Sequence, residues 1–369
     1  MAEKDFYSES IEFNWTIKKL STFEIQLLNH RFLKRIPKHL YKYRKSGEEG
    51  RIPFYVGERK IYTASLNNQN DIFEGVTPAT VERIQNLNVE GACRYYKNDM
   101  ISILSNRFPS LNKDLSEKIF ELFLEKHFDK DAIFLLAKGF VKESEQKELK
   151  TVIAALVYLF KKLETETDEN SDFAKGMRWL ANANDLVGAF CMCDSCSHEN
   201  LWAKYADDFK GYCIEYDLSD PCRSKGSIRF ISSLYPVSYV EKKDDDWFKP
   251  LFESTIATIG IDGKGDKQKS GMIFHRWFIK TICSKNKERW SNENEWRVIG
   301  DANRSYLGPL VSAIIVGHNI DKKDFETIKN CAEKNDFPLK ITDIDYLNKK
   351  VIVRELMPGD IRRINARHE

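Results

Sequence analysis

Two glutamates separated by one residue stand beside two tryptophans and two arginines in ERWSNENEWRVIG, residues 288–300. In an extended chain Glu293 and Glu295 would point to the same side, because side chains alternate along a strand. Two carboxylates on one face could stabilise the positive charge that develops when a glycosidic bond breaks. Residues 296–299 have the character of a packed strand, so the carboxylate of Glu295 is not expected to anchor the core.

Further residues with suitable chemistry stand in three other segments. HLYKYRKSG (39–47) predicts a short strand that leads to an arginine. KIYTASLNNQNDIFEG (60–75) predicts a strand with hydroxyl side chains and then a polar loop. LWAKYADDFKGYCIEYD (201–217) predicts a short helix, a tight turn at Gly211 and a strand. The candidate residues in these segments are Tyr43, Arg44, Thr63, Ser65, Asn70, Asp71, Glu74, Trp202 and Tyr205.

Three cysteines and one histidine lie close together in CMCDSCSH, residues 191–198. Such ligands can bind zinc, but the spacing C-x-C-x-x-C-x-H is not followed by a second pair at the usual distance. Cys191 and Cys193 also fit a buried strand, where a reduced cysteine packs like a small apolar residue. We therefore expect no zinc at Cys191, Cys193, Cys196 and His198, and no metal cofactor.

The composition excludes several classes of protein. The 58 basic and 56 acidic residues give a formal net charge of +2, which indicates no general attraction to nucleic acid or to an anionic membrane. No window approaches about 18 uncharged apolar residues, and MAEKDFYSES lacks an apolar signal segment, so we expect no membrane span. The eight cysteines are then expected to be reduced thiols of a cytoplasmic protein. The sequence also lacks the P-loop, Rossmann and nucleophile-elbow motifs.

The pattern of elements predicts an α+β fold with a mainly antiparallel sheet core, a helical insertion and flanking helices. Residues 1–76 are expected to form an N-terminal helix (10–36) and the first strands, residues 77–185 the helical insertion, and residues 186–369 the remainder of the core. Asp321 is expected to cap a helix that precedes a closing hairpin. Other expected elements are strands at 186–193, 211–218, 227–240, 294–300 and 311–317 and a helix at 271–285.

The segments LYKYR, IYTASLNNQNDIFEG, LWAKYADDFKGYCIEYD and W-x-x-E-x-E-W-R follow one another in an order that resembles the domain of unknown function 2971 family of bacteria and phages. The helical block at 77–184 is longer than the family pattern implies, and cysteines stand at 191 and 193 where serine or phenylalanine is expected. The resemblance implies an effector or accessory protein of bacterial antiviral defence, with partner proteins of a defence system. It implies no particular activity.

An arginine on an early strand, hydroxyl residues on the next strand and Glu-x-Glu on a late strand also resemble the Arg, Ser/Thr, Glu arrangement of ADP-ribosyltransferases. This resemblance implies NAD as the substrate, no metal, and a protein, a nucleic acid or water as the acceptor of ADP-ribose. Arg44 would clamp the pyrophosphate, and Glu295 with Glu293 would face the oxocarbenium-like ribose. Ser65 would brace the glutamate, and Tyr205 would stack on nicotinamide. The other contacts to NAD would come from Tyr43, Thr63, Asn70, Asp71, Glu74, Trp202 and Arg297.

Two other functions fit the same residues. A non-catalytic module could use the polar cluster to sense a nucleotide or to bind a partner, with Glu295 and Arg297 as a structural ion pair. A metal-dependent nuclease could hold Mg²⁺ with Asp71, Glu74, Glu293 and Glu295, and would need a basic groove for nucleic acid. A cleft that both Arg44 and Glu295 face, without clustered carboxylates, would favour the transferase.

Overall fold

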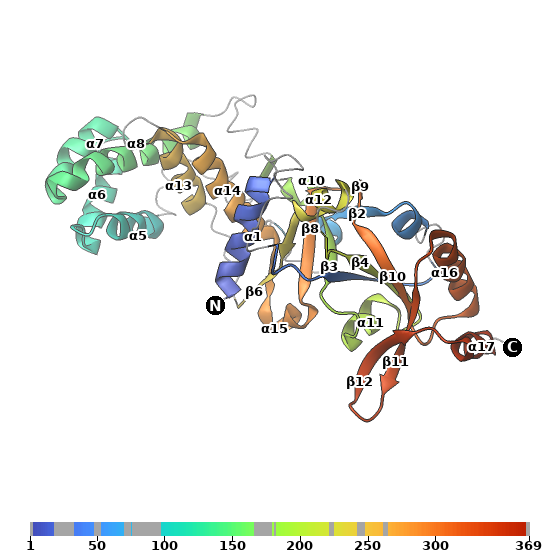
Figure 1. Cartoon of the computed structure of the whole chain (residues 1–369). Helices are drawn as coiled ribbons and strands as arrows, with labels where there is room; N and C mark the ends of the chain where they lie inside the picture. The colour runs from blue at the N-terminus through green and yellow to red at the C-terminus, as the bar shows by residue number, and fades with distance from the viewer. Residues whose placement is uncertain are drawn as a thin grey trace. The chain divides into compact units, whose positions relative to one another are not determined.

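The structure is a computed structural model of the chain. It confirms the α+β class, because a mainly antiparallel sheet is combined with several helices (Figure 1). Two compact units divide the chain: an α+β unit (1–74, 184–243 and 283–369) and a helical unit (75–183 and 244–282). Residues 244–282 thus join the helical unit, although they were expected in the remainder of the core. The structure describes residues 3–17, 33–47, 53–69, 75, 97–165, 179–180, 182–220, 225–241, 248–260 and 265–366.

The α+β unit is built around a large β-sheet and a small second one. Their strands are β1 (His39–Arg44), β2 (Lys60–Ser65), β3 (Val187–Cys193), β4 (Tyr212–Asp217), β5 (Leu234–Pro236), β6 (Ser238–Val240), β7 (Ser284–Asn286), β8 (Glu295–Asp301), β9 (Arg304–Leu307), β10 (Leu310–Val316), β11 (Leu339–Asp345) and β12 (Lys350–Glu355). In the large sheet the order is β12-β11-β10-β4-β1-β3-β2-β9, and β8 pairs with β3 and β5. In the large sheet, strands β10 and β11 are parallel and the other strand pairs are antiparallel. Strands β6 and β7 form the second, parallel pair.

Helices occur in both units. Those of the helical unit are α5 (Lys97–Arg107), α6 (Lys113–Glu125), α7 (Lys130–Ala137), α8 (Glu143–Thr165), α13 (Phe248–Ile259) and α14 (Lys267–Ile282), with a 3₁₀ turn at Lys138–Phe140. The other helices are α1 (Glu3–Ile17), α10 (Ala183–Leu186), α11 (Glu199–Tyr205), α12 (Lys225–Ile231), α15 (Lys287–Trp290), α16 (Lys322–Asn335) and α17 (Pro358–Ala366), with short turns at Pro53–Gly57, Leu66–Asn68 and Ser291–Glu293.

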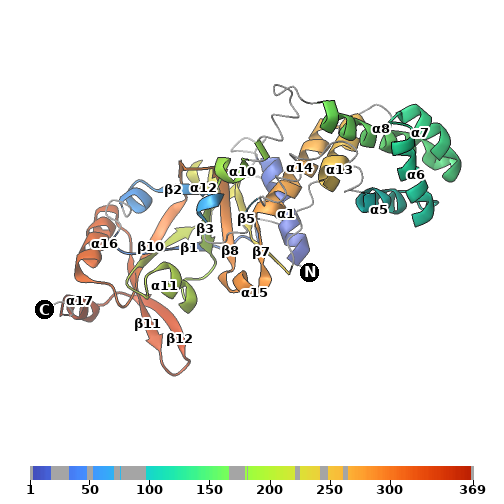
Figure 2. The same ribbon diagram turned by 180° about the vertical axis from the view of Figure 1, so that it is seen from behind.

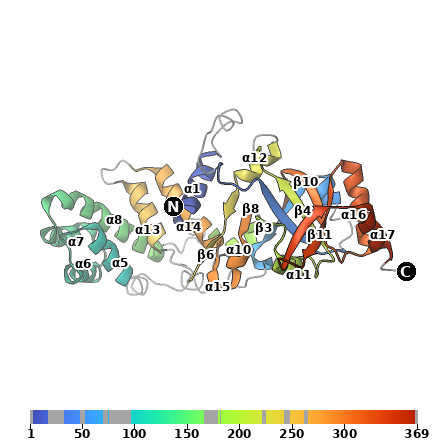
Figure 3. The same cartoon turned by 60° about the horizontal axis from the view of Figure 1, so that its bottom comes forward.

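Helices α11 and α16 cover opposite faces of the centre of the large sheet. Ile214 of β4 belongs to a buried cluster with Phe325 of α16, whereas its neighbour Cys213 belongs to another cluster with Trp202 of α11. Successive side chains of a strand point to opposite faces, so β4 is buried on both sides. Figures 2 and 3 show α16 and α17 beside the end of the sheet that carries β10 and β11.

Helix α16 forms as its sequence predicts. The side chain of Asp321 accepts a hydrogen bond from the backbone N–H of Asp324 at 2.8 Å, which confirms the expected N-cap. Phe325, Ile328 and Ala332, at helical spacing, form its buried stripe. The helix ends at Asn335, the cap residue Asp336 has a φ of 55° in the left-handed region, and the closing hairpin of β11 and β12 follows.

Other expectations about elements were wrong. Residues 227–240 do not form one strand: α12 occupies 225–231, and only 234–236 and 238–240 are extended. Phe230 and Ile231 bury their side chains in the core from the helix, so tertiary packing overrides their β propensity. The helix expected at 271–285 ends at Ile282, and β7 begins at Ser284. Of the helix expected at 10–36, residues 10–17 are helical within α1 and residues 33–35 form a turn instead, while residues 18–32 lie outside the described residues.

Candidate functional site

A pocket of about 780 Å³ lies in the α+β unit where β1 and β3 separate. These antiparallel neighbours have one registered pair, Tyr41 with Cys193. Beyond that pair, residues 42–45 line the pocket on one side and residues 189–191 on the other. The volume lies within the range of roughly 300–1,000 Å³ that is typical of small-molecule sites. Six aromatic side chains in its lining are Tyr41, Tyr43, Tyr55, Tyr62, Phe190 and Tyr205.

The end of β1 is held against the turn that precedes β4. Gly211 packs on the carbonyl oxygen of Arg44, and a Cβ at this position would lie 2.1 Å from that oxygen. Only glycine allows such a close approach between backbones. The tight turn predicted at Gly211 therefore has a second role, which is to fix the backbone of a pocket residue.

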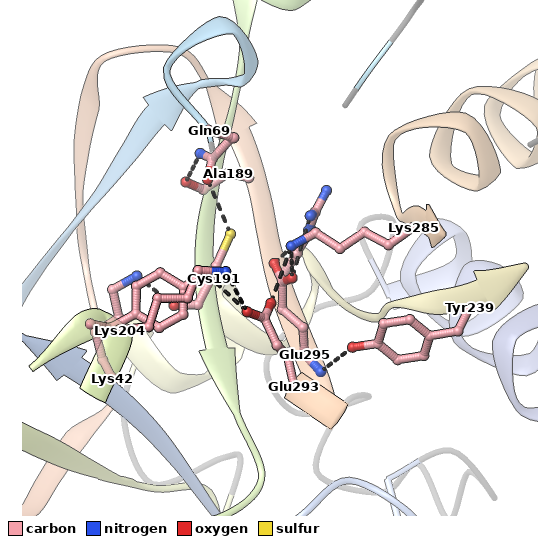
Figure 4. A network of polar contacts seen from close by, with 11 residues as sticks. Lys42, Gln69, Ala189, Cys191, Lys204, Tyr239, Lys285, Glu293 and Glu295 are labelled. Atoms are coloured by element: carbon pink, nitrogen blue, oxygen red, sulfur yellow. Dashed lines mark hydrogen bonds and ion pairs between the residues drawn. The ribbon is translucent and has the colours of Figure 1, made fainter. Parts of the chain in front are cut away.

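Glu295 stands at the first position of β8 and anchors a buried network of charges (Figure 4). Its Oε1 accepts a hydrogen bond from Nε of Arg297 at 2.7 Å, and its Oε2 lies 2.6 Å from Nζ of Lys285. Burial alone would raise the pKa of Glu295, but the charges of Arg297 and Lys285 outweigh it and hold the pKa well below its usual range. The expectation that this carboxylate does not anchor the core was therefore wrong.

Glu293 belongs to the same network but not to the strand. It ends the 3₁₀ turn at 291–293, and Asn294, with a φ of 44°, turns the chain into β8. The hydroxyl of Tyr205 donates to Oε1 of Glu293 at 2.9 Å, and Lys285 donates to Oε2 at 3.3 Å. Exposed Lys204 adds an ion pair at 3.2 Å. Both glutamates line the pocket, although not as alternate residues of one strand. We name Glu293, Glu295, Lys285 and Arg297 the glutamate cluster.

Across the pocket, β1 presents two cations that we name the cation pair: Lys42 and Arg44. Nζ of Lys42 donates to the backbone carbonyl of Cys191 at 2.6 Å, across the gap between β1 and β3. The guanidinium of Arg44 lies 4.1 Å from the ring centroid of Tyr55, and no described group accepts a hydrogen bond from its buried Nε. Among the described residues, no carboxylate forms an ion pair with either cation.

The electrostatic state of Lys42 follows from this environment. Burial, followed by the nearby charge of Arg44, lowers the pKa of Lys42 from 10.5 to about 8. Buried charges in proteins are usually paired or bound to a ligand, because removing an ion from water is unfavourable. Both side chains of the cation pair are half-buried and have no ion pair to a described carboxylate, so an anion in the pocket would be stabilised beside them.

The remaining predicted site residues have other positions. The hydroxyl of Thr63 donates to the carbonyl of Asp301 at 2.6 Å, and that of Ser65 donates to the carbonyl of Asn184 at 2.9 Å. Trp202 is buried, with its indole N–H bonded to the carbonyl of Cys196 at 2.8 Å. These three side chains hold the fold and do not line the pocket. Asn70, Asp71 and Glu74 lie outside the described residues.

The cysteines at 191–196 make ordinary thiol contacts. The thiol of Cys191 lines the pocket and donates to Oε1 of Gln69 at 3.5 Å. Cys193 donates to the carbonyl of Ser195 at 3.0 Å, and burial raises the pKa of its thiol to about 12. Within the described part of the chain, no group of three His, Cys, Asp or Glu side chains is arranged to hold a metal ion.

Several residues of the site were not predicted from the sequence, among them Lys42, Lys285 and Tyr55. A signal for Lys42 was present, because Lys-x-Arg in HLYKYR puts two cations on one face of a strand by the alternation rule applied to the glutamates. No local pattern marks Lys285, which follows a long helix, or Tyr55, which lies in a short turn.

The comparison with protein families gives one match. Residues 201–298 match the family described as Protein of unknown function (DUF2971), so the predicted resemblance to that family is confirmed over this segment. No curated protein and no solved structure matches the chain. Within the described residues, no helix has both the length and the apolar character needed to cross a bilayer.

Proposed function

We propose that this chain, which carries the DUF2971 segment at residues 201–298, binds NAD between β1 and β3 and acts as an ADP-ribosyltransferase-like enzyme. The observation that supports this most directly is the cation pair, two half-buried cations beside aromatic rings and without an ion pair to a described carboxylate. A pyrophosphate supplies the missing negative charge. The glutamate cluster on the other side of the same pocket supplies carboxylates for the chemistry.

Phosphate recognition falls to Arg44 and Lys42. A planar guanidinium can donate two parallel hydrogen bonds to phosphate oxygens, and its stacking on Tyr55 fixes the plane. Lys42, two residues earlier on the same face of β1, adds a point charge beside that fork. Since neither side chain has to leave a carboxylate to meet the ligand, binding breaks no ion pair.

Glu293 is the carboxylate best suited to face the reacting ribose. Both oxygens of Glu295 are engaged by the buried cations Arg297 and Lys285, whereas Glu293 is held by a tyrosine hydroxyl and by longer contacts to lysines. When the bond from ribose to nicotinamide breaks, nicotinamide leaves with the electron pair and positive charge develops on the sugar. A fixed carboxylate stabilises that charge until the acceptor attacks. Glu295 would then position Lys285, which contacts both glutamates.

The test is NAD consumption and transfer of labelled ADP-ribose, with protein and nucleic-acid acceptors present, for the wild type and Glu293→Gln. Glutamine keeps the shape but removes the charge, so we expect the rate to fall by about a hundredfold or more. Exposed Glu288→Gln, in the same segment, is the matched control and should keep full activity. Equal rates for the wild type and Glu293→Gln would reject the assignment of Glu293.

A non-catalytic nucleotide-binding module is the second candidate. The firm engagement of both oxygens of Glu295 favours it, because those bonds stabilise the fold without any reaction. Calorimetric binding of NAD without turnover in any acceptor mixture would select this function, and absence of both binding and turnover would reject both. A Mg²⁺-dependent nuclease has less support, because Lys285 and Arg297 already pair with Glu293 and Glu295, two of the four carboxylates that it would need. The place of the protein in antiviral defence stays a prediction.

A further inference from the structure

Trp290 begins the motif W-x-x-E-x-E-W-R, and no step of the proposed reaction uses it. It ends helix α15, whose start is capped by Asn286: the side-chain Oδ1 accepts a hydrogen bond from the backbone N–H of Arg289 at 3.1 Å. The 3₁₀ turn at 291–293 follows directly and ends at Glu293. Residues three apart in helical backbone lie on the same side of the chain. The spacing W-x-x-E therefore places the indole ring beside the carboxylate.

Two lysines from distant segments meet at this ring. Nζ of Lys204, on α11, lies 3.9 Å from the ring centroid of Trp290, and Nζ of Lys285, on β7, lies 4.4 Å from it. Both distances are within the reach of about 6 Å for a cation–π contact. The same ammonium groups pair with Glu293, Lys204 with Oε1 at 3.2 Å and Lys285 with Oε2 at 3.3 Å (Figure 4). Each lysine thus joins the indole to a different oxygen of one carboxylate.

The indole of Trp290 contributes its face and not its polar atom. No described group accepts a hydrogen bond from its buried Nε1, and the residue does not line the pocket. An aromatic face attracts a cation through the ring quadrupole, and tryptophan does so most strongly among the aromatic residues. A free lysine side chain has many rotamers, and ordering it costs conformational entropy. A ring that attracts two ammonium groups offsets that cost at the point where both groups contact Glu293.

We infer that Trp290 is a positioning residue for Glu293, because its ring keeps both lysines on the two carboxylate oxygens. For its effect on the reaction, the inference rests on the proposed function. Without the indole, the partly exposed side chain of Lys204 is free to turn to solvent. Lys285 then keeps its closer contact, which is with Glu295 at 2.6 Å. A carboxylate that is no longer fixed gives less stabilisation to the positive charge that develops on the ribose.

Steady-state kinetics of NAD turnover with Trp290→Leu and Trp290→Phe test the catalytic consequence. The leucine variant loses the aromatic face, so kcat should fall about tenfold, which corresponds to one cation–π contact of ordinary strength. Its dissociation constant for NAD should stay within about twofold of the wild type, because the cation pair is unchanged. Phenylalanine keeps an aromatic face and removes no hydrogen bond to a described group, so it should restore most of kcat.

The matched control is Trp179→Leu, at a tryptophan of the helical unit, which should have wild-type kinetics. Wild-type kcat in Trp290→Leu would overturn the inference. Equal losses of kcat in the leucine and phenylalanine variants would also overturn it, because the aromatic face would then not be what the site uses.

A measurement that needs no turnover separates this inference from the proposed function. In protein whose lysines carry carbon-13 at the ε position, the ε-methylene protons of Lys204 and Lys285 lie next to ammonium groups over the indole, so their NMR signals should be shifted upfield. Lys204→Met and Lys285→Met assign the two signals. Both signals should lose the upfield shift in Trp290→Leu and keep part of it in Trp290→Phe.

The two readouts fail in different ways. Upfield shifts that persist in Trp290→Leu would overturn the inference, whether or not the protein consumes NAD. Shifts that disappear in Trp290→Leu, in a protein whose wild type never consumes NAD, would reject the proposed function and support the contact of the indole with both lysines.

Discussion

The two sides of the pocket treat charge differently. In the glutamate cluster, carboxylates and cations compensate each other within ion-pair distances of 2.6–3.3 Å. The cation pair on β1 contacts a carbonyl and two aromatic rings, and no described carboxylate lies within ion-pair distance of it. The fold gains ion pairs from the glutamate cluster, but it gains none from the two cations of β1. The difference underlies our proposal that the cation pair binds the ligand, whereas the ion pairs of the glutamate cluster contribute to stability.

The largest expected effect is on stability, from Glu295→Gln. Removing this charge leaves Arg297, which is fully buried, and Lys285 without their closest carboxylate. Breaking a buried ion pair in this way costs about 3–5 kcal/mol, and urea unfolding should show a loss in that range. Since the pKa of Glu295 is held below its ordinary value of 4.5, its contribution is present above that pH and is lost as the pH falls further.

The acid-dependent part of wild-type stability should accordingly be reduced in Glu295→Gln. The matched variant Glu293→Gln should lose only about 1 kcal/mol, because Lys285 keeps its 2.6 Å contact with Glu295. Equal stability losses for the two variants would contradict the difference between the buried and the more accessible glutamate.

The next effect is on binding, from Arg44→Ala. Loss of charge-assisted hydrogen bonds to phosphate should weaken NAD binding by about 2 kcal/mol, which is roughly thirtyfold, with stability changed by less than about 1 kcal/mol. Isothermal titration with NAD and with ADP-ribose measures this. Arg44→Lys keeps the charge but not the planar fork, so its NAD affinity should lie between those of the wild type and Arg44→Ala. If Arg44→Ala unfolded as readily as Glu295→Gln while binding NAD normally, Arg44 would serve stability and not ligand binding, which would contradict this assignment.

A smaller effect is the pH dependence that Lys42 confers. Because the pKa of Lys42 is lowered to about 8, NAD affinity should fall several-fold as the pH rises through about 8 and the ammonium loses its proton. Lys42→Met should bind NAD more weakly at neutral pH and without this dependence. The unfolded chain holds the proton up to about 10.5, so wild-type stability should rise with pH between about 8 and 10.5, unlike that of the variant. Identical pH profiles for the two proteins would contradict this assignment.

The smallest effect should come from Lys204→Met. Its ion pair with Glu293 is partly exposed, with 44 % of the lysine side chain accessible, so we expect a loss below about 1 kcal/mol. Lys285→Met, which removes the buried lysine shared by both glutamates, should cost clearly more in the same thermal melt. Similar losses of stability in the two variants would mean that burial does not determine how much each lysine of this network contributes to stability.

Local sequence patterns predicted the helices and strands whose own residues carry a clear signal, such as alternation or a helix cap. Alternation and polar ends predicted β2 and β8 within one residue and the start of β1, which ends three residues earlier than expected, and the cap at Asp321 predicted the start of α16. The same patterns failed at 225–231, where aromatic and β-branched residues form α12 because the core accepts them from a helix. Local propensity is weak compared with burial, so such segments follow their tertiary surroundings.

The sequence by itself determined which residues carry charge at the ends of β1 and β8, and therefore that Arg44, Glu293 and Glu295 were candidates. Only the tertiary structure decided their partners. It placed Lys285 between the two glutamates, closed Glu295 against Arg297, and left Lys42 and Arg44 without a described carboxylate. These outcomes depend on contacts between residues far apart in the chain, and no local periodicity encodes which distant charge will lie within ion-pair reach.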